Sequence, residues 1–229
     1  MQTIPMNIAE NFRLLRERID ASARRAGHAV RLLAVSKTQP TDAIANLVSF
    51  GQRAFGENYV QEALAKRAAL SALDLEWHLI GPLQSNKARE AALHFDWLHS
   101  LDRAKLVAAL GRHRPQTLPP LQVLVQVNVD DEESKSGCSP DGVDALAAAI
   151  AATAGLTLRG LMAIPAPADL ARRGAAFARM RRLFERLRAD HAQVDTLSMG
   201  MSDDFELAIA EGATLVRVGS ALFGARPAR

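Results

Sequence analysis

Short apolar runs alternate with amphipathic stretches along the whole chain. The apolar runs are five to nine residues long, as β-strands are, and the stretches between them repeat their apolar residues with helical spacing. We therefore expect eight strands, over residues 31–36, 53–57, 76–81, 96–100, 121–129, 156–164, 195–200 and 214–219.

Several of the expected strands are apolar along most of their length, which is typical of a parallel sheet covered on both faces. No Asn-Gly or Asp-Gly pair joins neighbouring runs in a tight hairpin. Eight repeats of strand and helix without a linker predict a single α/β domain, a (β/α)8 TIM barrel over residues 1–229. A doubly wound open sheet is the alternative. Residues 7–26 have one apolar helical face and predict an extra N-terminal helix.

The composition, with 48% hydrophobic and 23% charged residues, is that of an ordinary soluble globular protein. No apolar run approaches the roughly 18 residues that a membrane-spanning helix needs, and the first residues lack the pattern of a secretory signal. The single cysteine, Cys138, excludes an intrachain disulfide and a multi-cysteine zinc site. We therefore expect a cytoplasmic protein without a metal site.

Positive charge is concentrated in one expected helix, residues 172–190, although the net charge of the chain is only +3. Its arginines lie largely off the apolar stripe, so this helix has the pattern of an amphipathic helix packed on a core. We expect neither nucleic acid nor a membrane as a partner.

Lys37 directly follows the first expected strand, and the functional residues of α/β barrels gather at the carboxyl ends of strands. Burial among apolar side chains lowers the pKa of an amine, because it disfavours the charged form, and a neutral amine can form a Schiff base. Alternatively, Lys37 extends into solvent or pairs with a carboxylate such as Glu57. Its position in the sequence does not separate these hypotheses.

The last two strands end in residues suited to an anion. Gly219 lets a ligand approach the backbone, and Ser220 stands where a short helix would begin. Ser202, after the seventh strand, could add a hydroxyl, and this corner of the barrel is a frequent phosphate site. Both serines could also be simple helix caps.

Other polar or flexible residues lie in or just after the strands. Arg217, inside the last strand, either faces a ligand or extends outward between a helix and the strand. Asn58 could bind a ligand or cap a helix. His78 could also bind a ligand, although a core histidine whose hydrogen bonds are satisfied is the simpler interpretation. Met199 could cover a flat ring, but packing in the core is its more ordinary role.

Seven motifs occur together and in order: AVSKTQP, FGENYVQEAL, EWHLIGPLQSNKAR, VLVQVNVDDEESKSGC, LRGLMAIPAP, DTLSMGMSDDFELAI and VRVGSALFGAR. Over residues 7–226 the chain closely resembles the pyridoxal phosphate homeostasis proteins. The resemblance implies a barrel like the N-terminal domain of alanine racemase, with pyridoxal 5′-phosphate bound as an internal aldimine on the lysine of the AVSK motif, here Lys37. Pro82 and Ser220 depart from this pattern, since histidine and threonine are common there.

The resemblance also implies roles for the other candidates. Ser202, Gly219 and Ser220 would hold the phosphate, and Arg217 would lie near the pyridine nitrogen. Asn58, His78 and Met199 would surround the ring.

Proteins of this family are regarded as non-catalytic carriers that buffer or deliver the cofactor. The residues fit this role, because racemization by two bases needs a second acid or base opposite the lysine, and the only tyrosine is Tyr59. We expect a monomer that serves PLP-dependent apo-enzymes. An amino-acid racemase of low activity and a cofactor-free Schiff-base aldolase are the alternative functions.

Overall fold

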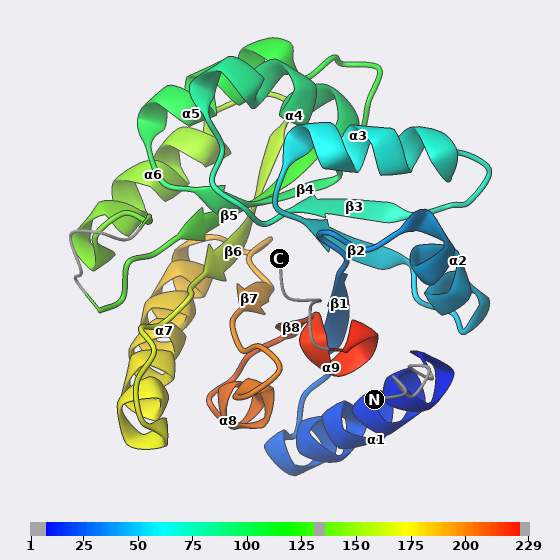
Figure 1. The fold of residues 1–229 in the computed structure, drawn as a ribbon. Coiled ribbons are helices and arrows are strands. Elements are labelled where there is room, and N and C mark those ends of the chain that lie inside the picture. The colour runs from blue at the N-terminus through cyan, green and yellow to red at the C-terminus, as the bar shows by residue number, and fades with distance from the viewer. Residues whose placement is uncertain (1–7, 131–135, 225–229) are drawn as a thin grey trace.

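Eight parallel strands close into a barrel in the computed structural model, which describes residues 8–130 and 136–224. Helices surround the barrel on the outside (Figure 1). The strands are β1 (Arg31–Val35), β2 (Ala54–Glu57), β3 (Glu76–Leu79), β4 (Trp97–Leu101), β5 (Leu121–Gln126), β6 (Leu156–Met162), β7 (Thr196–Ser198) and β8 (Leu215–Val218).

Pairing of the first strand with the last closes the barrel. Ala34 of β1 lies opposite Phe55 of β2 on one side and Val218 of β8 on the other. The predicted barrel is thereby confirmed, and the doubly wound sheet, which needs two open edges, is wrong. Several strands end earlier than predicted. β5 stops at Gln126, because the chain then leaves the sheet and Val127 forms an isolated bridge with Cys138.

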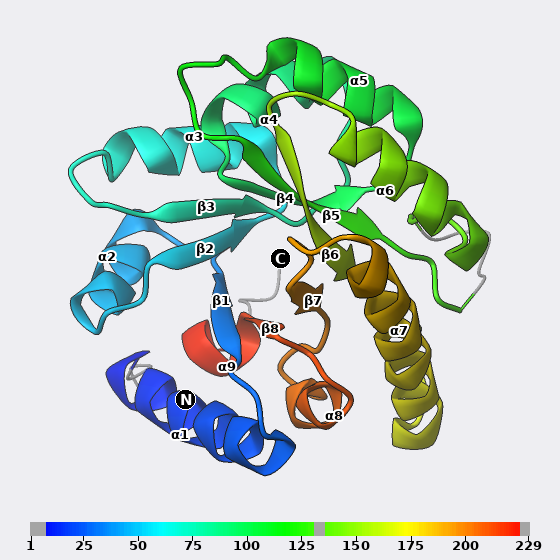
Figure 2. The same cartoon turned by 180° about the vertical axis from the view of Figure 1, so that it is seen from behind.

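The helices follow the strands in alternation, and Figure 2 shows the same ring from behind. They are α1 (Ile8–Ala26), α2 (Thr41–Ser49), α3 (Val60–Ala69), α4 (Ala88–His94), α5 (Ala104–His113), α6 (Val143–Ala151), α7 (Leu170–Asp190), α8 (Phe205–Ala210) and α9 (Ser220–Phe223), with 3-10 turns at Ser85–Lys87 and Pro140–Gly142. None of these described helices has both the length and the apolar character to span a membrane.

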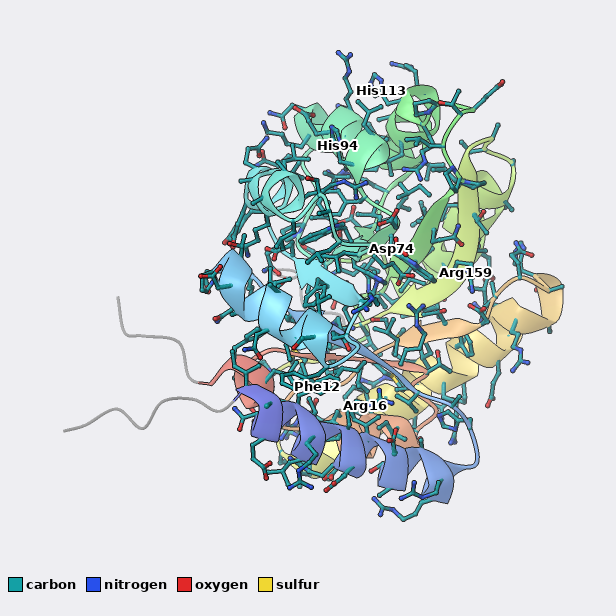
Figure 3. The ribbon with its side chains drawn as sticks, turned by 90° about the vertical axis from the view of Figure 1, so that its right-hand side faces the viewer. Phe12, Arg16, Asp74, His94, His113 and Arg159 are labelled. Carbon is teal, nitrogen blue, oxygen red and sulfur yellow. The ribbon has the colours of Figure 1, made fainter. Side chains whose placement is uncertain are left out.

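The extra N-terminal helix, α1, packs beside the barrel against α2, α8 and α9. Its buried face includes Leu15 and Ile19, and the ring of Phe12 stacks on Phe50 after α2. In the side view of Figure 3, Phe12 and Arg16 are labelled on this helix. The predicted helix over residues 7–26 is confirmed from Ile8 onward, and residue 7 lies outside the described residues.

Alternation along each strand separates a barrel interior from an outer core. Leu33, Ala54 and Leu215 form one cluster inside the barrel, and Trp97, Leu124 and Met162 form another. The neighbouring positions, such as Phe55, join the large core between barrel and helices. Which side a residue faces therefore depends on its parity along the strand.

Candidate functional site

A cavity of about 520 Å³ opens at the carboxyl ends of the strands. Its lining combines an amine, a guanidinium, hydroxyls and amides contributed by loops from both halves of the chain. The polar or flexible lining residues include Lys37, Asn58, Gln126, Met201, Ser202, Asp203, Arg217, Gly219 and Ser220. Six of the eight residues predicted from the sequence lie here.

Lys37 follows β1 and lines the cavity, and its two neighbours in the chain are held from outside the barrel. Thr38 has the left-handed φ of 64°, which is strained for a β-branched residue. Its backbone N–H donates to the Glu62 carboxylate (2.5 Å), and the Ser36 carbonyl accepts from Lys66 Nζ (2.7 Å). The loop that carries Lys37 is thus fixed on both sides of the lysine.

Those contacts belong to a buried ion pair between α3 and β2. Lys66 Nζ donates to Glu57 Oε1 (2.8 Å) and to Glu62 Oε1 (2.6 Å), and the Ser36 hydroxyl also donates to Glu57 (2.6 Å). Glu57 shares its side of β2 with Phe55 and therefore faces the outer core, where burial raises its pKa. The lysine that contacts Glu57 here is Lys66.

Two serine hydroxyls meet at the corner formed by the loops after β7 and β8. The Ser220 hydroxyl donates to Ser202 Oγ (2.9 Å), and the Ala221 N–H reaches the same oxygen at 3.4 Å. A Cβ at Gly219 would come within 3.2 Å of the Val35 carbonyl, so a side chain there would crowd β1. The corner presents donors and open backbone to the cavity, which suits an anionic group.

Arg217 lies inside the barrel wall and lines the cavity while remaining 4% exposed. Its Nη1 donates to the carbonyl and the hydroxyl of Ser198 (2.7 and 2.8 Å), and its Nη2 donates to the Ala163 carbonyl (2.8 Å). Burial lowers the pKa of Arg217 to about 10, so the group stays a cation at neutral pH. The inward of the two predicted orientations is therefore confirmed.

Two predicted residues do not line the cavity. Met199 is fully buried in the outer core between barrel and helices, because it follows Ser198 and faces the opposite side of the sheet. Met201, two residues further on and 39% exposed, lines the cavity instead. His78 is buried in the barrel interior, where it contacts His99 and Glu76.

Sequence reasoning also missed Gln126 and Ile164, which line the cavity from the ends of β5 and β6. The available signal was that both residues lie in the last four positions of predicted strands, 121–129 and 156–164. No group of three or more histidine, cysteine, aspartate or glutamate side chains that could hold a metal occurs in the described part of the chain.

The arrangement suits a small molecule that carries both an aldehyde and an anionic group. An amine, a cationic guanidinium and the hydroxyl corner line the same cavity, and they come from the neighbouring strands β1, β8 and β7 or the loops that follow them. Such a cavity can bind a carbonyl compound covalently through its lysine while the anion is held elsewhere.

Residues 7–227 match the family model of the alanine racemase N-terminal domain. The pyridoxal phosphate homeostasis protein of Pseudomonas aeruginosa is 55% identical over 227 residues, covering 99% of this chain and 97% of that protein. The chain belongs to the pyridoxal phosphate homeostasis protein family. The protein of that name from Escherichia coli K12 is 51% identical over 227 residues, covering 96% of this chain and 97% of its own length.

Solved structures place this family member beside PipY of Synechococcus elongatus. The PipY structure without PLP has a TM-score of 0.86 and 41% identity, and the one with PLP bound has 0.84 and 40%. Each comparison covers 95% of this chain and all of PipY. The resemblance read from the seven motifs is thereby confirmed.

Proposed function

We propose that this protein binds pyridoxal 5′-phosphate in the cavity at the carboxyl end of the barrel, and holds and releases it to buffer or deliver the cofactor. The carrying observation is that Lys37, Arg217 and the Ser202–Ser220 corner line one cavity. Relatives named for pyridoxal phosphate homeostasis and the PLP-bound PipY structure support the proposal.

The residues present fit the cofactor. Its aldehyde supplies the electrophile, and Lys37 would hold it as an imine with loss of one water. Ser202, Ser220 and the backbone at Gly219 would hold the phosphate, Arg217 would lie near the pyridine nitrogen, and Asn58 would contact the ring. Met199 and His78 would support these groups from outside the cavity.

We propose further that the protein is a carrier without catalytic turnover, a cytoplasmic monomer of one domain that serves PLP-dependent apo-enzymes. A guanidinium donates hydrogen bonds and keeps its proton at neutral pH, so Arg217 would leave the pyridine nitrogen unprotonated and the ring a weak electron sink. Tyr59 is 64% exposed and is not among the described residues that line the cavity.

Three measurements test the carrier. Titration with pyridoxal 5′-phosphate should give a saturable visible absorption band, and the loaded protein should restore activity to a PLP-dependent apo-enzyme. A flat titration refutes cofactor binding. A panel of amino acids should show deuterium exchange at the α-carbon no faster than with the free cofactor, and faster exchange would favour the racemase alternative.

A further inference from the structure

A hydrogen-bonded chain of five side chains crosses the barrel interior from β8 to β3. Arg217 Nη1 lies 2.8 Å from Ser198 Oγ, which lies 3.1 Å from Nδ1 of His99. Nε2 of His99 lies 2.8 Å from Nδ1 of His78. Nε2 of His78 lies 2.5 Å from Glu76 Oε1. The hydrogen-bonded chain therefore joins Arg217, which lines the cavity, to Glu76 at the amino end of β3.

The two ends give this chain a direction. A guanidinium only donates and a carboxylate only accepts, so Arg217 donates to Ser198 and Glu76 accepts from His78. The oxygen of the Ser198 hydroxyl accepts a hydrogen bond from Arg217, so its hydrogen is free to donate to Nδ1 of His99. Every donor and acceptor is satisfied when both imidazoles are neutral and carry their proton on Nε2. Burial lowers the pKa of both histidines, which favours these neutral rings.

The far end of the chain is anchored near the amino ends of the strands. Glu76 also accepts from Arg31 (2.6 Å), and the ring of His78 stacks on Trp97 with centroids 5.3 Å apart. The guanidinium of Arg159 packs on the same indole at 5.0 Å. Figure 3 labels Arg159 on the half of the molecule away from α9. The rings are thus held by stacking as well as by hydrogen bonds.

We propose that this chain positions the Arg217 guanidinium in the cavity, with His99 as the positioning residue. Both acceptors of Arg217 Nη1 belong to Ser198. The Ser198 hydroxyl presents a lone pair to Arg217 only while its own hydrogen points elsewhere, and His99 is the acceptor that takes this hydrogen. Loss of that acceptor frees the hydroxyl to rotate and loosens the guanidinium. The consequence for the cofactor rests on the proposed function, whereas the chain itself does not.

The first test uses cofactor-free protein and nitrogen NMR of the imidazoles and guanidinium. Both His78 and His99 should show a protonated Nε2 and a bare Nδ1 at neutral pH, and the Arg217 N–H protons should exchange slowly. His99→Phe, which keeps a ring but no nitrogen, should speed that exchange about tenfold or more. His99→Asn, whose oxygen can accept from Ser198, should largely retain the slow exchange. His94→Gln, on the exposed end of α4 and labelled in Figure 3, is the matched control.

Three results would overturn the proposal: a proton on Nδ1 of either ring, a charged ring at neutral pH, or unchanged exchange of the Arg217 N–H protons in His99→Phe.

The second test is titration with pyridoxal 5′-phosphate. Ser198→Ala and His99→Phe should weaken affinity about two- to tenfold and shift the absorption band or its pH profile, while His99→Asn should not. If His99→Phe binds with wild-type affinity and spectrum, the chain is a satisfied polar core and no more. If the wild-type protein binds no cofactor, the proposed function fails. The NMR spectra of the cofactor-free protein then still test the hydrogen-bonded chain.

Discussion

The buried ion pair beside the Lys37 loop gives the sharpest prediction, through the variant Lys66→Met. The side chains of Lys66 and Glu57 are 8% and 0% exposed, so the variant leaves a carboxylate without its cation in the outer core. Removing one partner of a buried pair costs about 3–5 kcal/mol in the free energy of unfolding. For a chain of this size that corresponds to a fall in Tm of roughly 6–20 °C.

The loss should depend on pH with a definite sign. Burial raises the pKa of Glu57, and the hydrogen bond and charge of Lys66 oppose the rise, so the variant raises this pKa further. A carboxyl whose pKa is higher in the folded protein stabilises it below the unfolded pKa and loses that contribution as pH rises through the folded pKa. The penalty of Lys66→Met should therefore be larger near about pH 8 than near about pH 5.

Urea unfolding at both pH values measures the effect, with Arg13→Met as the control. Arg13 forms ion pairs with Glu10 and Glu17 on the exposed face of α1, and its loss should leave the midpoint nearly unchanged. Lys66→Met/Glu57→Gln should recover most of the stability, because no unpaired charge remains. A Lys66→Met midpoint equal to that of the control, or a penalty that grows as pH falls, would refute the reasoning.

Three further predictions follow from single residues. Gly160 has φ 144°, and a Cβ there would overlap the Thr196 carbonyl. Gly160→Ala should therefore lower the free energy of unfolding, measured in urea, by at least about 2 kcal/mol, and a smaller loss would contradict this packing. Burial raises the pKa of Cys138 to about 11, so a thiol reagent should label the native protein roughly 100-fold more slowly near neutral pH than the unfolded chain, and equal rates would contradict it. Ser202→Ala should weaken pyridoxal 5′-phosphate binding about ten- to a hundredfold, since hydrogen bonds to charged groups are strong. Ser49→Ala on α2 is the control, and equal affinities of the two variants would contradict a role of Ser202 in holding the phosphate.

The sequence was sufficient to predict the barrel, because eight apolar runs with helices between them have few other solutions. Lys37, Asn58 and the serine corner follow from the same logic, since residues just after parallel strands meet at one end of a barrel. Met199 shows the limit of that logic. A shift of one residue reverses the face of a strand residue, and a strand of three residues, Thr196–Ser198, gives too little alternation to fix its register.

The polar chain could not be read from the sequence, because its members come from four strands and only the closed barrel brings them together. His99 had one available signal, a polar residue within the buried run DWLHS, two positions from Trp97 and so on the same face. The ion pair of Lys66 was equally hidden, since a lysine on an amphipathic helix normally lies in solvent.

Borohydride reduction of the protein mixed with pyridoxal 5′-phosphate, followed by mass mapping of the peptides, tests the central claim most directly. We predict one equivalent of reduced adduct on Lys37, its loss in Lys37→Ala, and its retention in Lys87→Ala, a lysine of the turn at Ser85–Lys87. An adduct spread over other lysines, or one that persists in Lys37→Ala, would contradict the assignment of this cavity as the cofactor site.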